Sequence, residues 1–113
     1  MATTKLLIIP DISGKPSYTL QQSNVIYTGL LSAGVAQSIT APTDAAQYMV
    51  RISISNGADV LVSVNGAAAI PVGAFGTSTT EINIAQTYVA AGGTVSLISP
   101  QSNVICSVGF YAV

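Results

Sequence analysis

The residues that could carry out acid–base, nucleophilic or metal chemistry are few in this sequence and far apart. Its 113 residues include no histidine and four carboxylates, Asp11, Asp44, Asp59 and Glu81. General acid–base catalysis near neutral pH depends on histidine or on carboxylates that share a pocket. No two of these carboxylates are close in the sequence, so only the fold could pair them. We therefore predict no catalytic residue and no enzymatic activity.

Cys106 is the one cysteine in the sequence, and its surroundings favour a structural role. A catalytic cysteine needs a neighbouring base to form its thiolate, and this chain has no imidazole to act as one. One cysteine without histidine cannot complete a zinc site within one chain, and no acidic loop has the pattern of a calcium site. We expect Cys106 to be a small core residue, and we expect neither a metal nor a cofactor.

The charge composition favours a protein that associates with others. Only 6% of the residues are charged, 50% are hydrophobic, and the formal net charge is −1. Soluble domains carry roughly 25% charged residues, and their charges oppose association. Burying serine or threonine against a neighbour costs less free energy than burying lysine or glutamate. We expect a homo-oligomer or an assembly subunit; the alternative is a polar, weakly charged monomer.

Nucleic acid and membranes are not expected partners. The three cations, Lys5, Lys15 and Arg51, cannot neutralise the run of phosphates that dominates affinity for nucleic acid. The longest aliphatic run, residues 6–9, ends at Pro10 and is far shorter than the ~20 residues of a membrane helix. The run is also too short for a signal peptide, so we expect synthesis in a cytoplasm without export by that route.

Strand patterns dominate from residue 47 onward. Apolar and polar residues alternate in residues 50–55 (VRISIS) and again in residues 60–65 (VLVSVN), as in strands with one buried face. Asn56-Gly57 between them has the composition of a turn. We predict that these two strands form a hairpin.

The rest of the chain is expected to contain further short strands and no long helix. The expected strands are residues 5–9, 18–20, 25–28, 35–40, 79–85 with Ile82 and Ile84 inward, 87–90, 94–99 and 104–113. Residues 67–76 are rich in glycine and proline, and we expect them to form a crossing loop that packs through Ile70, Val72 and Phe75. A single helical turn is expected over residues 44–47. Strands at this spacing predict an all-β, single-domain antiparallel β-sandwich or jelly-roll-like barrel, residues 17–113.

Three features of the sequence are candidates for contact with a partner. Residues 1–16 are either an edge strand with a loop or an extended N-terminal arm that pairs with a neighbouring subunit's sheet edge. Arg51 faces outward on its strand, either solvated or paired with a neighbouring subunit. The end of the last strand has a face that does not belong to the core. The candidate interface residues are Lys5, Leu6, Ile8, Lys15, Arg51, Tyr111 and Val113.

Residues 47–57 (QYMVRISISNG), 60–66 (VLVSVNG) and 92–99 (GGTVSLIS) together resemble the small β-sandwich virion proteins of tailed bacteriophages. These include capsid decoration (cement) proteins and head–tail or tail accessory proteins. The resemblance implies a virion protein that stabilises the shell by bridging neighbouring subunits, with copies of itself and a major capsid, connector or tail protein as partners. A head–tail connector, tail or fibre component is one alternative, and a non-viral surface or appendage subunit is another.

A carbohydrate-binding adhesion module is an alternative of a different class. Tyrosine rings can stack on sugars, and a host-surface glycan would then be the ligand. The tyrosines that would form such a platform are Tyr18, Tyr27, Tyr48 and Tyr88. The sequence has no tryptophan and few charged hydrogen-bonding partners, so this alternative ranks below an assembly role.

Overall fold

The protein consists of ten short strands. The computed structural model describes residues 2–10, 12–19 and 21–113, with the side chains of all of these except residues 8 and 17–19. No residue in this part of the chain lies in a helix. The strands are β1 (Leu7–Pro10), β2 (Pro16–Thr19), β3 (Ile26–Leu31), β4 (Gln37–Thr40), β5 (Gln47–Ile54), β6 (Leu61–Val64), β7 (Thr80–Ile82), β8 (Gln86–Ala90), β9 (Thr94–Ile98) and β10 (Val104–Ala112).

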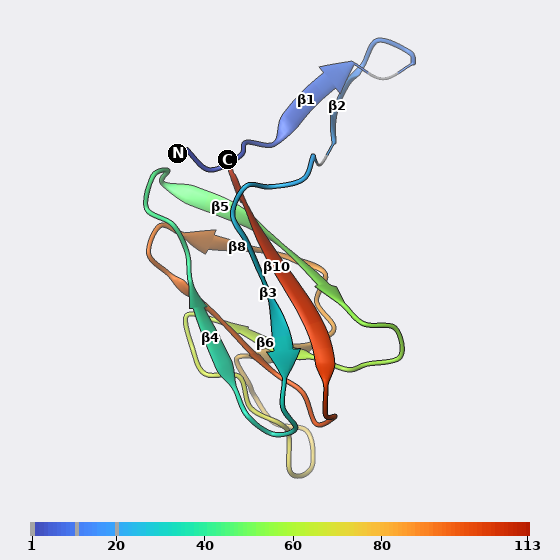
Figure 1. Ribbon diagram of the computed structural model, residues 1–113, viewed down its shortest axis with the longest axis vertical. Coiled ribbons are helices and arrows are strands. Elements are labelled where there is room, and N and C mark those ends of the chain that lie inside the picture. Colours follow the sequence, from blue (N-terminus) through green and yellow to red (C-terminus); the bar gives the residue numbers. More distant parts are fainter. Residues whose placement is uncertain (1, 11, 20) are drawn as a thin grey trace.

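Strands β3 to β10 form two facing antiparallel sheets (Figure 1). They pair from the two ends of this segment inward: β3 with β10, β4 with β9, β5 with β8, and β6 with β7. Pairing of β10 with β5 and of β9 with β6 completes the sheets, whose orders are β3-β10-β5-β8 and β4-β9-β6-β7. Two four-stranded sheets wound in this way make a jelly roll. The predicted all-β antiparallel sandwich is confirmed.

The core lies between the two sheets and follows from the alternation in the sequence. The buried residues on one face of β10 are Val104, Cys106, Val108 and Phe110, as predicted. The Phe110 ring is fully buried and makes edge-to-face contacts with Tyr27 and Tyr48, at centroid distances of 6.0 and 6.4 Å. Such aromatic pairs add to the free energy gained by burial alone. The expected core position of Cys106 is confirmed.

The predicted hairpin between residues 50–55 and 60–65 is wrong. β5 pairs with β8 and β10, whereas β6 pairs with β7 and β9, so the two strands lie in different sheets. Val50 and Val62 meet in one core cluster from opposite sides. Asn56 and Gly57 do form a turn, and Gly57 has a φ of 78°. After this turn, however, the chain crosses from one sheet to the other.

A second, smaller apolar cluster covers the outer face of the β4-β9-β6-β7 sheet. Ala68 and Ile70 pack there against Leu61 and Ile98. The N–H of Ala68 donates a hydrogen bond of 2.9 Å to Oγ of Ser96, which is buried. This cover explains why β6 and β9 are buried on both faces, where a sandwich strand is ordinarily buried on one.

The loop that follows this cluster is only partly packed. Ile70 is half-buried as expected, but Val72 and Phe75 are fully exposed, at 100% and 110% of their reference areas. The predicted packing of these two residues is therefore wrong. Pro71, Gly73 and Gly76 disfavour strand pairing in this loop, so no backbone ladder holds Val72 and Phe75 against the sheet.

Two local predictions fail where the backbone departs from regular geometry. Ile82 is 56% exposed, while Ile84 packs against the core. Asn83 between them has a φ of 53°, so the strand is interrupted and the two isoleucines do not share a face. The expected helical turn over residues 44–47 is also absent, because residues 43–46 form bends and β5 begins at Gln47.

Strands β1 and β2 form a separate two-stranded hairpin, in the place of the predicted N-terminal arm. Leu7 lies opposite Thr19 and Pro10 opposite Pro16, so the hairpin continues beyond residue 16. It projects beyond the end of the jelly roll at which the C-terminus lies (Figure 1). The molecule is elongated as a result, with extents of 49, 30 and 28 Å.

Candidate functional site

The projecting hairpin is anchored to the jelly roll through its root, residues 2–6. Thr3 donates two hydrogen bonds to the carboxylate of Asp44, one from its N–H (2.6 Å) and one from its hydroxyl (2.8 Å). The hydroxyl of the fully buried Tyr48 donates to the same carboxylate (2.7 Å) and accepts from the N–H of Ala45 (2.7 Å). The Asp44 carboxylate therefore joins the hairpin root to the start of β5.

This hydrogen-bonding pattern determines the charge state of Asp44. The hydrogen bond from the Thr3 N–H, together with those from the hydroxyls of Tyr48 and Thr3, lowers the pKa of the Asp44 carboxyl from 3.8 to about 2. Donors that point at a carboxylate favour its ionised form. Burial and the bond to Asp44 raise the pKa of the Tyr48 hydroxyl above 10.0. Asp44 is thus ionised and Tyr48 neutral over the physiological pH range.

A second set of hydrogen bonds fixes the root to Asn24, just before β3, and to the last strand. The N–H and hydroxyl of Thr4 both donate to Oδ1 of Asn24, at 2.8 and 2.9 Å, and Nδ2 of Asn24 donates to the carbonyl of Ala2 at 2.7 Å. The N–H of Ala112 donates to the carbonyl of Thr4 at 2.9 Å. The root is therefore held on two sides, and the hairpin leaves it in a defined direction.

The hairpin itself exposes apolar side chains. Leu7 and Ile9 are 39% and 46% exposed, and Ile12 at its turn is 105% exposed. Leu7 and Ile9 lie two residues apart on one strand, so their side chains share a face. An isolated two-stranded hairpin is marginally stable in water. The exposed face of the hairpin is the kind of surface that is buried against another protein.

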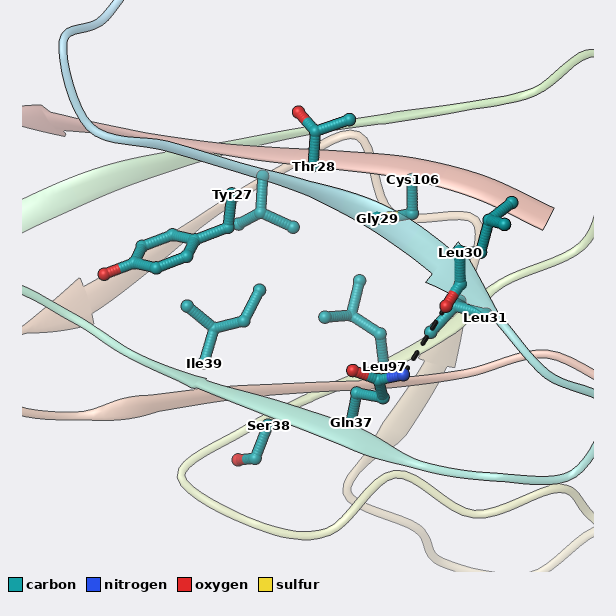
Figure 2. A pocket seen from close by; sticks show the side chains of 11 residues that line it. Tyr27, Thr28, Gly29, Leu30, Leu31, Gln37, Ser38, Ile39, Leu97 and Cys106 are labelled. Carbon is teal, nitrogen blue, oxygen red and sulfur yellow. Dashed lines mark hydrogen bonds between the residues drawn. The ribbon is translucent and has the colours of Figure 1, made fainter. Parts of the chain in front are cut away.

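A groove opens on one side of the jelly roll, between the edge strands β3 and β4. Figure 2 shows Tyr27 of β3 and Ile39 of β4 on either side of it. Its volume is about 310 Å³. The residues that line it are Tyr27, Thr28, Gly29, Leu30, Leu31, Gln37, Ser38, Ile39, Leu97, Cys106 and Val108. We call this feature the β3–β4 groove; none of its lining residues is charged.

Gly29 is the reason for the opening. It lies opposite Cys106 in the β3–β10 register, so it occupies an inward-facing position between Tyr27 and Leu31. A Cβ atom built at Gly29 would meet nothing within 4 Å. The two sheets therefore leave a gap there that reaches core residues such as Leu97. One side-chain hydrogen bond spans the gap, from Nε2 of Gln37 to the carbonyl of Leu30 at 3.4 Å (Figure 2).

The N-terminal residues predicted to form an interface belong to the hairpin and its root. Lys5 is exposed and bridges to Ala112, and the N–H of Leu6 donates to the Ala112 carbonyl at 3.3 Å. Ile8 lies on β1, and its side chain is outside the described part of the structure. Lys15 is exposed immediately before β2. These residues are brought together by the fold.

The other predicted interface residues lie elsewhere. Arg51 is exposed on the outer face of β5, beside a shallow depression that Gln22 and Ser107 also line. Tyr111 is only 3% exposed, and its hydroxyl donates a 2.6 Å hydrogen bond to the carbonyl of Gln21. Tyr111 is thus occupied within its own chain. Val113 is 51% exposed.

Sequence reasoning did not identify the β3–β4 groove. Gly29 was one glycine among ten, and its inward orientation follows from strand pairing that sequence alone does not give. The predicted strand, residues 25–28, stopped one residue before Gly29, whereas β3 continues to Leu31. A glycine inside a strand often marks a close approach of another chain or ligand, so the signal was lost with the strand boundary.

The described tyrosines do not form a common platform. Tyr27 lies on β3 and Tyr88 on β8, at opposite edges of the same sheet, while Tyr48 is buried in the core. Tyr18 has its side chain outside the described part. In residues 2–10, 12–19 and 21–113, no three histidine, cysteine or acidic side chains are grouped so as to hold a metal ion. The described residues also include no helix long and apolar enough to cross a membrane.

The fold and these two features define a jelly-roll β-sandwich with a clamped hairpin and an open, uncharged edge groove. No protein-family model, no curated protein and no solved structure matches the chain.

Proposed function

We propose that this chain is a structural subunit of a larger protein assembly, and that it acts by binding other subunits. The observation that carries the proposal is the hairpin, whose Leu7, Ile9 and Ile12 are exposed while its root is clamped by Asp44. A rigid anchor below an exposed apolar hairpin suits an element that contacts a neighbour, since the contact then needs little additional ordering.

The composition of the surface supports the same role. With 6% charged residues, the surface can be buried against a neighbour without removing many ionic groups from water. The second exposed apolar element, the loop with Val72 and Phe75, lies at the opposite end of the molecule from the hairpin (Figure 1). Apolar contacts at both ends suit a subunit that has neighbours on two sides.

A virion protein is the particular assembly subunit that we favour, and capsid decoration is its most suitable form. Two arguments support this choice: the resemblance of residues 47–66 and 92–99 to small bacteriophage virion proteins, and the jelly roll, a fold that recurs in viral capsid domains. The second is an argument by analogy of fold, since one fold serves many functions. A head–tail connector, tail or fibre component fits the same two arguments.

A glycan-binding module is the second candidate function, because lectins also use jelly rolls. The positions of Tyr27, Tyr48 and Tyr88 do not favour it, since two are at opposite sheet edges and one is buried. A sugar-binding site needs an aromatic face next to convergent polar groups.

The proposal is tested by co-expressing the full chain with the major capsid protein encoded in the same genome. We expect the chain to co-sediment with the assembled shells and to raise their melting temperature. Absence from purified shells and tails, combined with a monomeric mass and selective binding on a glycan array, would overturn the proposal.

A further inference from the structure

We infer that the β3–β4 groove is the receptor for the β1–β2 hairpin of a second copy of this chain, with Leu7 and Ile9 filling the gap over Gly29. The inference rests on the proposed assembly function, and it goes beyond it by naming both surfaces of one contact.

The gap over Gly29 calls for an apolar occupant. Its floor is the hydrophobic core, with Leu97 and Val108 from the two sheets, and the polar residues Thr28, Gln37 and Ser38 also line it. The groove volume of about 310 Å³ is twice that of a ~150 Å³ apolar cavity able to bind benzene. It therefore has room for two branched aliphatic side chains. Leaving such a gap open costs packing interactions along its walls.

The hairpin offers side chains of the right kind and spacing. Leu7 and Ile9 lie about 7 Å apart on one face of β1, the distance between alternate residues on a strand. The outer backbone edge of β1 can pair with that of β3, the outermost strand of its sheet, where the Leu30 carbonyl would exchange its long bond from Gln37 for one from β1. Pro10 ends the free edge of β1, because proline has no N–H to donate, and so limits the pairing to a few residues.

The hairpin cannot fill the groove of its own chain. Its root is held by the bonds of Thr3 to Asp44 and of Thr4 to Asn24, and it extends beyond the end of the jelly roll (Figure 1). The groove lies along the side, between β3 and β4 (Figure 2). A neighbouring copy is therefore the source of the hairpin that fits. The positions of the charges are compatible with this contact, because Lys5 and Lys15 flank the apolar face and would remain outside the uncharged groove.

A donor–acceptor experiment tests the inference. Gly29→Val fills the gap and makes a chain that can only donate its hairpin; the double variant Leu7→Thr, Ile9→Thr keeps strand-forming residues and makes a chain that can only accept. Wild-type mass, measured by light scattering, should increase with concentration. Each variant alone should remain monomeric, and their 1:1 mixture should form a heterodimer. Gly109→Ala, on the outer face of β10, and Ile82→Thr, at an exposed isoleucine of β7, are the matched controls and should associate like the wild type.

Cys106 provides a second measurement that needs no introduced cysteine. It lines the groove, is buried at 6% exposure and is the one cysteine in the sequence, so the slow rate of its labelling by a maleimide reports on opening of the groove. Labelling of the wild type should slow as concentration rises, and labelling of the Leu7→Thr, Ile9→Thr variant should not. A labelling rate that stays constant while the wild type associates would overturn the inference, as would a Gly29→Val chain that is folded and still self-associates.

The outcomes separate this inference from the proposed function. A wild-type chain that stays monomeric, with Cys106 equally reactive at all concentrations, but still co-sediments with shells, would overturn the hairpin–groove contact and leave the assembly role standing. A chain that forms the heterodimer but never binds shells would do the opposite.

Discussion

Thr3 and Asp44, 41 residues apart in the sequence, are joined by two hydrogen bonds that end on the two oxygens of one carboxylate, at 2.6 and 2.8 Å. This pairing fixes the root, residues 2–6, at the base of the projecting hairpin. Charge-assisted hydrogen bonds to a carboxylate are among the stronger polar contacts in proteins. Asp44 therefore supplies one of the two anchors that set the direction of the hairpin, and Asn24 with Ala112 supplies the other.

Asp44→Asn should loosen the hairpin root without unfolding the jelly roll. The amide cannot accept at both positions as a carboxylate does, so Thr3 loses part of its anchorage. Hydrogen exchange at the amides of residues 3–6 should become faster, while exchange in the middle of β5 and β10, at Ile52 and Val108, stays unchanged. Asp59→Asn, in a turn away from the root, is the control. Equal protection of residues 3–6 in both variants would contradict this role of Asp44.

Acid should release the root in a defined pH range. Because the pKa of Asp44 is lowered from 3.8 to about 2 in the folded chain, its stabilising contribution is complete above pH 3.8 and is lost as the pH falls towards 2. The difference in melting temperature between the wild type and Asp44→Asn should accordingly shrink over this range. A difference that is constant from pH 5 to pH 2 would argue against ionised Asp44 as the anchor.

Filling the gap at Gly29 should stabilise the isolated subunit. A glycine within a strand costs roughly 0.5–1 kcal/mol relative to alanine, and the Cβ added here meets no atom within 4 Å. Gly29→Ala should therefore raise the free energy of unfolding by about that amount in urea titrations. If it lowers stability instead, the space over Gly29 is occupied within the monomer.

Gly93→Ala should destabilise the jelly roll. A Cβ at this position would lie 2.6 Å from Cγ2 of Val89 and 2.7 Å from Oδ1 of Asn65, closer than atoms can approach. The resulting backbone shift should cost about 1–3 kcal/mol in the free energy of unfolding, as for other overpacked sites. Gly73→Ala, where nothing lies within 4 Å, is the control and should leave stability unchanged.

Phe75→Ser should leave the stability of the isolated subunit within about 0.5 kcal/mol of wild type, because the ring is fully exposed. The thermal midpoint of the dilute protein measures this directly. Ile70→Ser, five residues before Phe75 and packed against the buried Leu61, should lower the midpoint. A loss of stability in the Phe75 variant would mean that the loop packs against its own chain.

The sequence patterns were sufficient to locate the strands and the all-β class, but not the partners of each strand. Alternation in residues 50–55 and 60–65 identifies Val50 and Val62 as core residues, and both are buried. In the second run it misses the outer cover, since Leu61 and Ser63, predicted to face outward, are buried as well. It does not distinguish two strands that pair within a sheet from two that face each other across a core. The pairing of β3 with β10, residues far apart in the chain, has no local signal.

The hairpin root and the groove were beyond sequence reasoning for the same physical cause. Thr3 reaches Asp44 because the end of β10 lies between the N-terminal segment and the start of β5, pairing with Lys5 on one side and with Tyr48 on the other. Gly29 opens the groove because its pairing with Cys106 of β10 places it on the inward face of β3. Lys5, Leu6 and Lys15 were identified because an apolar run between cations is visible locally. Tyr111 was placed on an open face because nothing local indicates that residues near Gln21 cover it.

The loop around Val72 and Phe75 has a practical consequence for engineering. A Cβ atom added at Gly73 or Gly76 would meet nothing within 4 Å, and exposed loop tips of this kind tolerate inserted sequence. A foreign epitope placed there would lie at the far end from the hairpin, so it should leave Leu7 and Ile9 unobstructed (Figure 1). An array built from such subunits would then present many copies of a chosen antigen at a regular, protein-determined spacing.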